Sequence, residues 1–167
     1  TDEEVLALAA LGIGAIAENR AQNFRARREL LATNGYDLPV HLIGSLQTNK
    51  VKYIIDKVDM IQSLDSERLA REIEKQARRI DRAVDVLIEI NSGHEESKSG
   101  IAPEAAADFA RLVTSGDFPH LRLRGFMTMA PRCRSAEEYR GYFLRMFFCL
   151  LSADLFSVFL PISDAGH

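Results

Sequence analysis

Short apolar runs alternate with longer amphipathic segments along most of the chain. The clearest run is "VDVLIEIN" at 84–91, where apolar and polar residues alternate as they do in a half-buried β-strand. Comparable apolar runs at 13–17, 40–44, 59–65 and 121–129 predict four more strands. The chain is therefore expected to contribute five strands to one sheet.

The segments between these runs have the spacing of helices. In "SERLAREIEKQARRI", one face carries Leu69, Ile73, Ala77 and Ile80, and Asp65 or Ser66 is placed to cap the helix. Thr1 can cap the first helix, because three acidic residues follow it directly. The helices are expected at 2–11, 25–32, 46–58, 66–80, 103–112 and 135–151.

The order of elements is a helix followed by five strand-plus-helix units. Alternation of this kind indicates parallel strands joined by crossover helices. Polar or small residues gather just after the strands, and the carboxyl ends of parallel strands build the binding sites of such folds. A ring of such ends favours part of a (β/α) barrel, with an open doubly wound sheet as the alternative.

The stretch "GIGAIAENR" at 12–20 also has the spacing of a dinucleotide-binding turn. In that fingerprint a strand precedes the glycines and a helix begins within them. Here the residues before Gly12 are helical and the strand overlaps the motif. Asp37 lies at the expected distance for the acidic residue, but in a loop. The match is interpreted as a coincidence of spacing.

Composition narrows the class of protein. The 167 residues are 47% hydrophobic, enough for one domain with a real core, and their formal net charge of −3 gives no general attraction to nucleic acid or an anionic membrane. The clusters Arg25–Arg28 and Arg78–Arg82 are interpreted as solvated helix faces. Two unpaired cysteines and an acidic start without a secretory leader indicate a cytoplasmic protein.

Other candidate chemistry is weak. "HEESK" at 94–98 lacks the second histidine of a zinc-protease helix, so no metal site is expected. His41 lies in a predicted strand and is interpreted as a satisfied core or pocket-wall residue. Cys133 and Cys149 are expected to be small buried hydrophobes. No lysine lies in a predicted strand, where an imine-forming lysine would have to be.

Five segments, in this order, resemble a known family: "AENRAQNF", "HLIGSLQTNKVKYI", "IQSLDSERLAREI", "VLIEINSGHEESKSGI" and "LRLRGFMTMAP". They are similar to the pyridoxal phosphate homeostasis proteins, also called the YggS or PROSC family. The resemblance covers residues 1–146 and implies a partial (β/α)8 TIM barrel of the alanine racemase N-terminal type, with about five of eight strands present. It implies pyridoxal 5′-phosphate as cofactor.

Carried over by motif, Asn19 would contact the cofactor, with His41, Asn91, Met127 and Thr128 as pocket neighbours. The family's imine-forming lysine belongs to a strand that would precede Thr1. Residues 147–167 are interpreted as a divergent apolar tail, so the chain is expected to be truncated at both ends.

These departures leave three hypotheses for function. The first is a non-catalytic cofactor-binding protein of vitamin B6 homeostasis with reduced affinity. The alternatives are a fragment of an alanine racemase-like enzyme and a structural fragment that binds nothing. Open strand edges would leave the chain monomeric or weakly self-associated.

Overall fold

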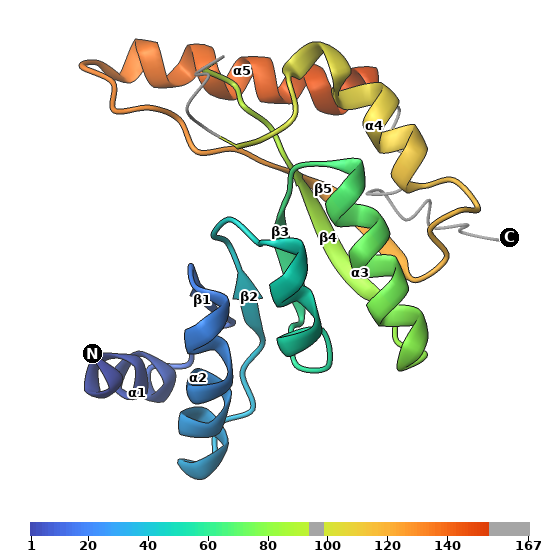
Figure 1. Cartoon of the computed structure of the whole chain (residues 1–167). Coiled ribbons are helices and arrows are strands. Elements are labelled where there is room, and N and C mark those ends of the chain that lie inside the picture. Colours follow the sequence, from blue (N-terminus) through green and yellow to red (C-terminus); the bar gives the residue numbers. More distant parts are fainter. Residues whose placement is uncertain (94–98, 154–167) are drawn as a thin grey trace, which may run out of the picture.

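The computed structural model describes residues 1–93 and 99–153. Its centre is a five-stranded parallel sheet whose strands follow the order of the sequence, β1-β2-β3-β4-β5 (Figure 1). The strands are β1 (Ile16–Glu18), β2 (Val40–Leu42), β3 (Met60–Leu64), β4 (Val84–Glu89) and β5 (Leu121–Met127). The helices are α1 (Asp2–Ala10), α2 (Ala21–Thr33), η1 (Thr48–Tyr53), α3 (Glu67–Arg79), η2 (Pro103–Ala105), α4 (Ala106–Val113) and α5 (Ala136–Ser152).

The strand order decides between the two architectures that the sequence left open. A doubly wound sheet reverses its order at a switch point, whereas a barrel adds each strand beside the previous one. Within the described residues each strand pairs only with its sequence neighbours, and all pairs are parallel. The chain therefore forms part of a (β/α) barrel, as predicted.

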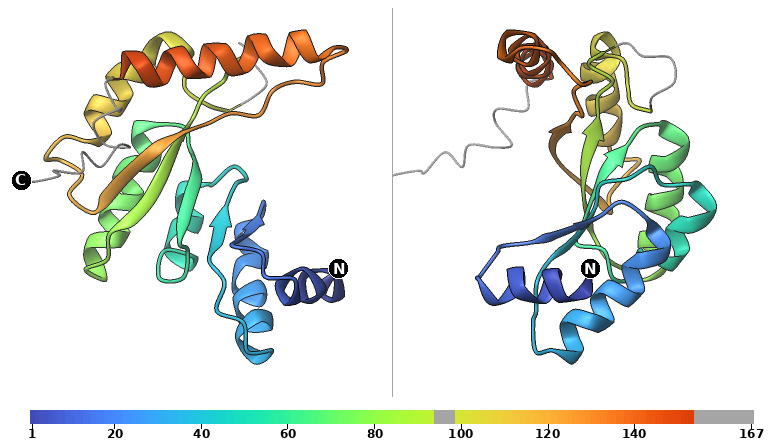
Figure 2. Two further views of the ribbon diagram at one scale, coloured as in Figure 1. Left: turned by 180° about the vertical axis from the view of Figure 1, so that it is seen from behind. Right: turned by 90° about the vertical axis from the view of Figure 1, so that its left-hand side faces the viewer.

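One face of the sheet is covered and the other is largely open. Helices α2 and α3 and the short η1 lie on the same side of the strands (Figure 2, right). In β4 the buried residues Val84, Val86 and Ile88 alternate with the half-buried Asp85 and Leu87. This alternation follows the two-residue period of a strand, and it places the hydrophobic core between the sheet and the helices.

The predicted elements other than the helix at 46–58 are confirmed, with shifts at their ends. Ile80, predicted on the inward face of its helix, instead follows the end of α3 and is 44% exposed. Thr1 caps α1 in a capping box with Glu4, and Ser66 caps α3 by accepting a hydrogen bond from the backbone of Leu69. Gly12 adopts a positive φ of 79° in the turn between α1 and β1. The glycines thus follow a helix and precede a strand, which confirms that they are no dinucleotide fingerprint.

The helix predicted at 46–58 is wrong in type. The chain forms a 3-10 helix only over Thr48–Tyr53, and Ile54 closes it by donating to the Val51 carbonyl at 3.1 Å. The buried residues are nevertheless those that a helical spacing selects: Val51, Ile54, Ile55 and Val58. The hydrophobic spacing therefore predicted the inward face correctly. Tight turns, in place of a continuous α-helix, provide the hydrogen bonds of the backbone.

The first arginine cluster is not a solvated helix face. Arg27 donates to Glu18 at 2.6 Å, and Glu18 is only 7% exposed. Arg28 donates to the carbonyls of Lys57 and Leu38 and is paired with Asp59. These two guanidinium groups attach α2 to the strands, because Arg27 pairs with a buried carboxylate and Arg28 satisfies several partly buried acceptors at once. Only Arg25 matches the prediction.

A bulge in β5 changes the direction of its side chains. The register with β4 shifts between Val86 and Leu87, where Gly125 adopts a φ of 142°. The bulge accompanies a charged cluster on the open face, where Arg122 and Arg124 approach the carboxylate of Asp85 at 2.7 and 2.9 Å. Bulges of this kind redirect side chains next to functional edges of a sheet.

The last described helix continues beyond the predicted end of the barrel segment. Helix α5 begins after the N-cap Ser135 and runs without a break to Ser152. The predicted boundary between 146 and 147 therefore falls inside a helix, and the division into two regions stays a prediction. Most of the tail, 154–167, lies outside the described residues.

Candidate functional site at the carboxyl ends of the strands

Three of the predicted site residues come together where β4 and β5 end. The Met127 carbonyl accepts a hydrogen bond from the backbone of Ile90 at 2.8 Å. The Thr128 hydroxyl donates to the Ile90 carbonyl at 2.7 Å and lies 2.8 Å from the hydroxyl of Ser92. Since Thr128 has a single proton to donate, Ser92 is the donor between the two hydroxyls. Thr128 thus ties two strand ends together and retains only acceptor capacity for a ligand.

Asn91 begins the loop that follows β4. Its backbone N–H donates to the Ile101 carbonyl at 2.9 Å, and Ile101 donates back to Glu89 at 2.7 Å. Gly100 lies so close that an added Cβ would be 2.8 Å from the Asn91 nitrogen, and its φ is 114°. The base of this loop is therefore closed tightly, while His94 and Lys98 lie outside the described residues.

Asn19 lies at the other side of the site, directly after β1. It is exposed and borders a hollow that also contains Ser45, Gln47 and Lys50. Gly44, after β2, approaches Asn19 so closely that a Cβ at this position would lie 1.9 Å from the Asn19 carbonyl oxygen. Only glycine permits this contact, which fixes the position of the Asn19 backbone.

His41 lies within β2, farther from the carboxyl ends of the strands than the other predicted residues. The register places it level with Ala17, Met60 and Asp85 of neighbouring strands. Its Nδ1 lies 2.9 Å from the amide nitrogen of Gln62, so the ring is half-buried and hydrogen-bonded. The hydrogen bond agrees with the prediction of a satisfied histidine, and its place in a pocket wall stays a prediction.

Sequence reasoning missed Glu89, the last residue of β4. It lies opposite Met127, is half-buried, and accepts a hydrogen bond from the Ser99 hydroxyl at 3.2 Å. Burial raises the pKa of the Glu89 carboxyl, and the nearby charge of Asp65 raises it further against the lowering effect of Ser99. The sequence could have indicated Glu89, because a charged residue that alternates with buried residues along a strand lies on the polar face of the sheet.

Replacing Glu89 with glutamine is expected to stabilise the protein at neutral pH. Because the folded pKa is raised, the folded state holds the proton more firmly than the unfolded state does. Stability therefore falls as pH rises from the unfolded pKa through the folded one. The variant should exceed the parent in Tm at about pH 8 and match it near pH 4. Solvent screening of a half-buried group limits the gain to about 1 kcal/mol or less.

Thermal unfolding followed by circular dichroism across this pH range measures the difference. Glu72→Gln is the matched control, because the pKa of Glu72 is lowered by hydrogen bonding to Gln76. Because the pKa of Glu72 is lowered in the folded state, its charged form stabilises the protein. Glu72→Gln should therefore be less stable than the parent above the unfolded pKa. A Glu89→Gln difference that does not depend on pH would contradict the expectation.

Other chemistry is not supported in the described part of the chain. Among residues 1–93 and 99–153 no three histidine, cysteine or acidic side chains gather as a metal site. Cys149 is buried, and this burial raises the pKa of its thiol, in agreement with a small core residue. No helix within these residues is long and apolar enough to cross a membrane.

A parallel sheet in sequential order is the architecture of part of a (β/α) barrel, a class of proteins whose binding sites lie at the carboxyl edge of the sheet. The family profile described as alanine racemase, N-terminal domain, matches residues 2–150, so the chain belongs to this family. This confirms the resemblance and the fold that were predicted from the sequence.

The relatives are similar over most of this chain. The pyridoxal phosphate homeostasis protein of Aquifex aeolicus is 41% identical over 135 residues, covering 81% of this chain and 58% of that protein. PipY of Synechococcus elongatus has been solved without and with pyridoxal phosphate, with TM-scores of 0.81 and 0.75 at 25% identity. The alignments cover 91% of this chain and 69% and 71% of PipY. The chain thus spans little more than half the length of the Aquifex protein.

Proposed function

We propose that this chain binds pyridoxal 5′-phosphate at the carboxyl ends of its strands and serves vitamin B6 homeostasis in the cytoplasm as a non-catalytic carrier. This proposal rests on one observation: a sequence similar to homeostasis proteins forms a barrel edge on which Asn19, Asn91 and Thr128 follow the ends of β1, β4 and β5. PipY, with the same fold, has been solved with this cofactor bound.

The described residues fit the cofactor in part. Asn19 has an exposed amide that can donate hydrogen bonds, and Gly44 fixes its position through the close contact between their strand ends. His41, Asn91, Met127 and Thr128 would be neighbours of the ring. None of the five described strands contains a lysine, so the sheet described here holds the cofactor by non-covalent contacts.

Titration of the chain with pyridoxal phosphate tests this function. We expect weak, reversible binding, detected by the change in cofactor absorbance. Asn19→Ala should weaken this binding about fivefold, which corresponds to the loss of one hydrogen bond of about 1 kcal/mol. Borohydride reduction followed by mass spectrometry should label no single lysine in full.

The control is Asn49→Ala, an exposed asparagine in η1. It should leave cofactor affinity unchanged. An absence of any absorbance change at millimolar cofactor would refute binding, and equal effects of the two variants would refute the role of Asn19.

The outer edges of β1 and β5 have no partner strand within the described residues. Helix α5 adds exposed side chains beside β5, with Phe143 at 55% and Phe148 at 62% exposure. These surfaces support a monomer that self-associates weakly through its open edges.

A further inference from the structure

A groove between the start of α2 and η1 carries an unbalanced positive charge. One hollow of ≈ 530 Å³ is bordered by Arg20 and Lys50. An adjoining one of ≈ 470 Å³ is bordered by Tyr53, by one acid, Asp56, and by the cations Arg25, Lys50, Lys52 and Lys57. The two hollows share Lys50 in their walls, so they form one continuous surface. We call it the α2–η1 groove.

Four cations of this groove have no carboxylate partners. In the part of the chain that the structure describes, Arg20, Arg25, Lys50 and Lys52 form no ion pair, whereas the adjacent Lys57 lies 2.5 Å from Asp56. The whole chain has a net charge of −3, so these four charges form a local positive field on an acidic protein. Such a field attracts a ligand with several negative charges.

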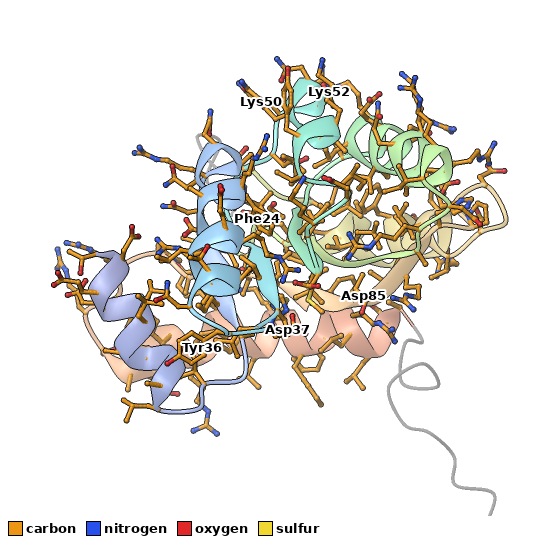
Figure 3. The ribbon with its side chains drawn as sticks, turned by 90° about the horizontal axis from the view of Figure 1, so that it is seen from below. Phe24, Tyr36, Asp37, Lys50, Lys52 and Asp85 are labelled. Carbon is orange, nitrogen blue, oxygen red and sulfur yellow. The ribbon has the colours of Figure 1, made fainter. Side chains whose placement is uncertain are left out.

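The groove also contains an aromatic surface. Tyr53 is 58% exposed, and the ammonium groups of Lys52 and Lys50 lie 4.9 and 5.8 Å from the centre of its ring. Both lysines project outward from η1 (Figure 3). A planar ring can stack on tyrosine while adjacent cations contact phosphate groups, as at nucleotide-binding surfaces. Helix α2 adds an N-terminus with no side-chain cap and no acidic residue in its first turn.

The length of the positive stretch limits the size of the ligand. Arg20 and Arg25 are five residues apart, which corresponds to about 7.5 Å along a helix. The next hollow along is bordered by the acids Glu29, Asp37 and Asp56 and by the cations Arg25, Arg28 and Lys57. Its charges balance, so the positive field does not continue in this direction. The groove therefore has room for two or three phosphates and excludes a long nucleic acid strand.

We propose that the α2–η1 groove binds a nucleoside di- or triphosphate, with the phosphates between the two arginines and two lysines and the base on Tyr53. The groove lies in the helical layer, whereas Glu89 and His41 lie on the sheet. Asn19 borders both regions, so the two sites adjoin without sharing the residues that carry this proposal.

Calorimetric titration of the whole chain with ATP, inorganic triphosphate and adenosine tests the proposal. We expect ATP to bind more tightly than inorganic triphosphate and adenosine to bind below detection. The double variant Lys50→Ala/Lys52→Ala should weaken ATP binding at least tenfold. Tyr53→Ala should weaken ATP binding and leave inorganic triphosphate unaffected, because only the base contacts the ring.

The matched control removes two charges elsewhere, in Arg68→Ala/Arg79→Ala on the exposed surface of α3. ATP affinity should stay within twofold of the parent. Equal loss in this control, or no binding of ATP at millimolar concentration, would overturn the proposal. Displacement of ATP by a lower concentration of a 12-residue oligouridylate would overturn it in favour of a nucleic acid site.

Pyridoxal phosphate titrations separate this proposal from the function proposed above. Lys52→Ala and Tyr53→Ala change residues that border only the second hollow, away from Asn19, so both variants should retain the parent's cofactor affinity while they weaken ATP binding. A loss of ATP binding with intact cofactor binding would identify the groove as a separate site. A parallel loss of both ligands in Lys52→Ala would show a single shared site and refute the proposal.

Discussion

Gly44→Ala is expected to destabilise the protein by about 3 kcal/mol or more and to disrupt the candidate cofactor site. The new Cβ would lie 1.9 Å from the carbonyl oxygen of Asn19, 2.7 Å from its carbonyl carbon and 2.9 Å from its Cα. All three are backbone atoms, so no side-chain rotation can relieve the clash. The ends of β1 and β2 must separate, and overpacking of this severity costs several kcal/mol.

The separation should also break the adjacent contact in which the backbone of Ile43 donates to the Glu18 carbonyl at 2.9 Å. Urea unfolding measures the loss of stability, and hydrogen exchange at Ile43 reports the broken contact directly. Asn19 would move with the strand end, so cofactor binding should fall together with stability. If the variant is insoluble, its soluble yield relative to the parent gives the same ranking.

Gly14→Ala is the matched control, because a Cβ there meets nothing within 4 Å and its φ is not positive. Its effect on stability should stay within about 0.5 kcal/mol. Similar unfolding midpoints for Gly44→Ala and the parent would show that the two strand ends do not approach as described.

Phe24→Ala is expected to cost about 3–5 kcal/mol, the usual range for removing a fully buried aromatic ring. Phe24 projects from α2 toward the strands and is 0% exposed (Figure 3). Its removal leaves a cavity beneath the same helix that Arg27 and Arg28 attach to the sheet. For a domain of this size the loss corresponds to a fall in Tm of roughly 6–20 °C.

Phe143→Ala in α5 serves as the control, since Phe143 is 55% exposed. It should change stability by no more than about 0.5 kcal/mol. Phe24→Leu keeps part of the buried volume and should lie between the control and Phe24→Ala, so the series can be ranked even if the alanine variant unfolds. Equal effects of Phe24→Ala and Phe143→Ala would place Phe24 outside the core.

The sequence predicted well those features that depend on residues near each other in the chain. The alternation in Val84–Glu89 and the caps at Thr1 and Ser66 are local, and the structure confirms each of them. The order of strands and helices was equally predictable, because the spacing of hydrophobic residues changes between the strand period and the helix period at each boundary.

Features that depend on distant partners were not predictable in this way. The roles of Arg27 and Arg28 depend on Glu18 and Asp59, which reach them only after β1 and β3 are placed. The single hydrogen bond between Ser92 and Thr128 joins residues 36 positions apart. Within the candidate site, the resemblance identified the residues to consider, and the fold then showed which of their groups are already occupied.

The sequential order of the strands has a consequence for how the chain folds during its synthesis. Each described strand after β1 pairs with the strand made just before it, so each new unit meets a finished neighbour as it leaves the ribosome. In sheets of mixed strand order, a strand must wait for a partner from a distant part of the chain, and this slows folding. A sheet that adds each strand at one edge avoids this delay. The nascent chain can therefore assemble in steps, with the most recently made strand always forming the growing margin.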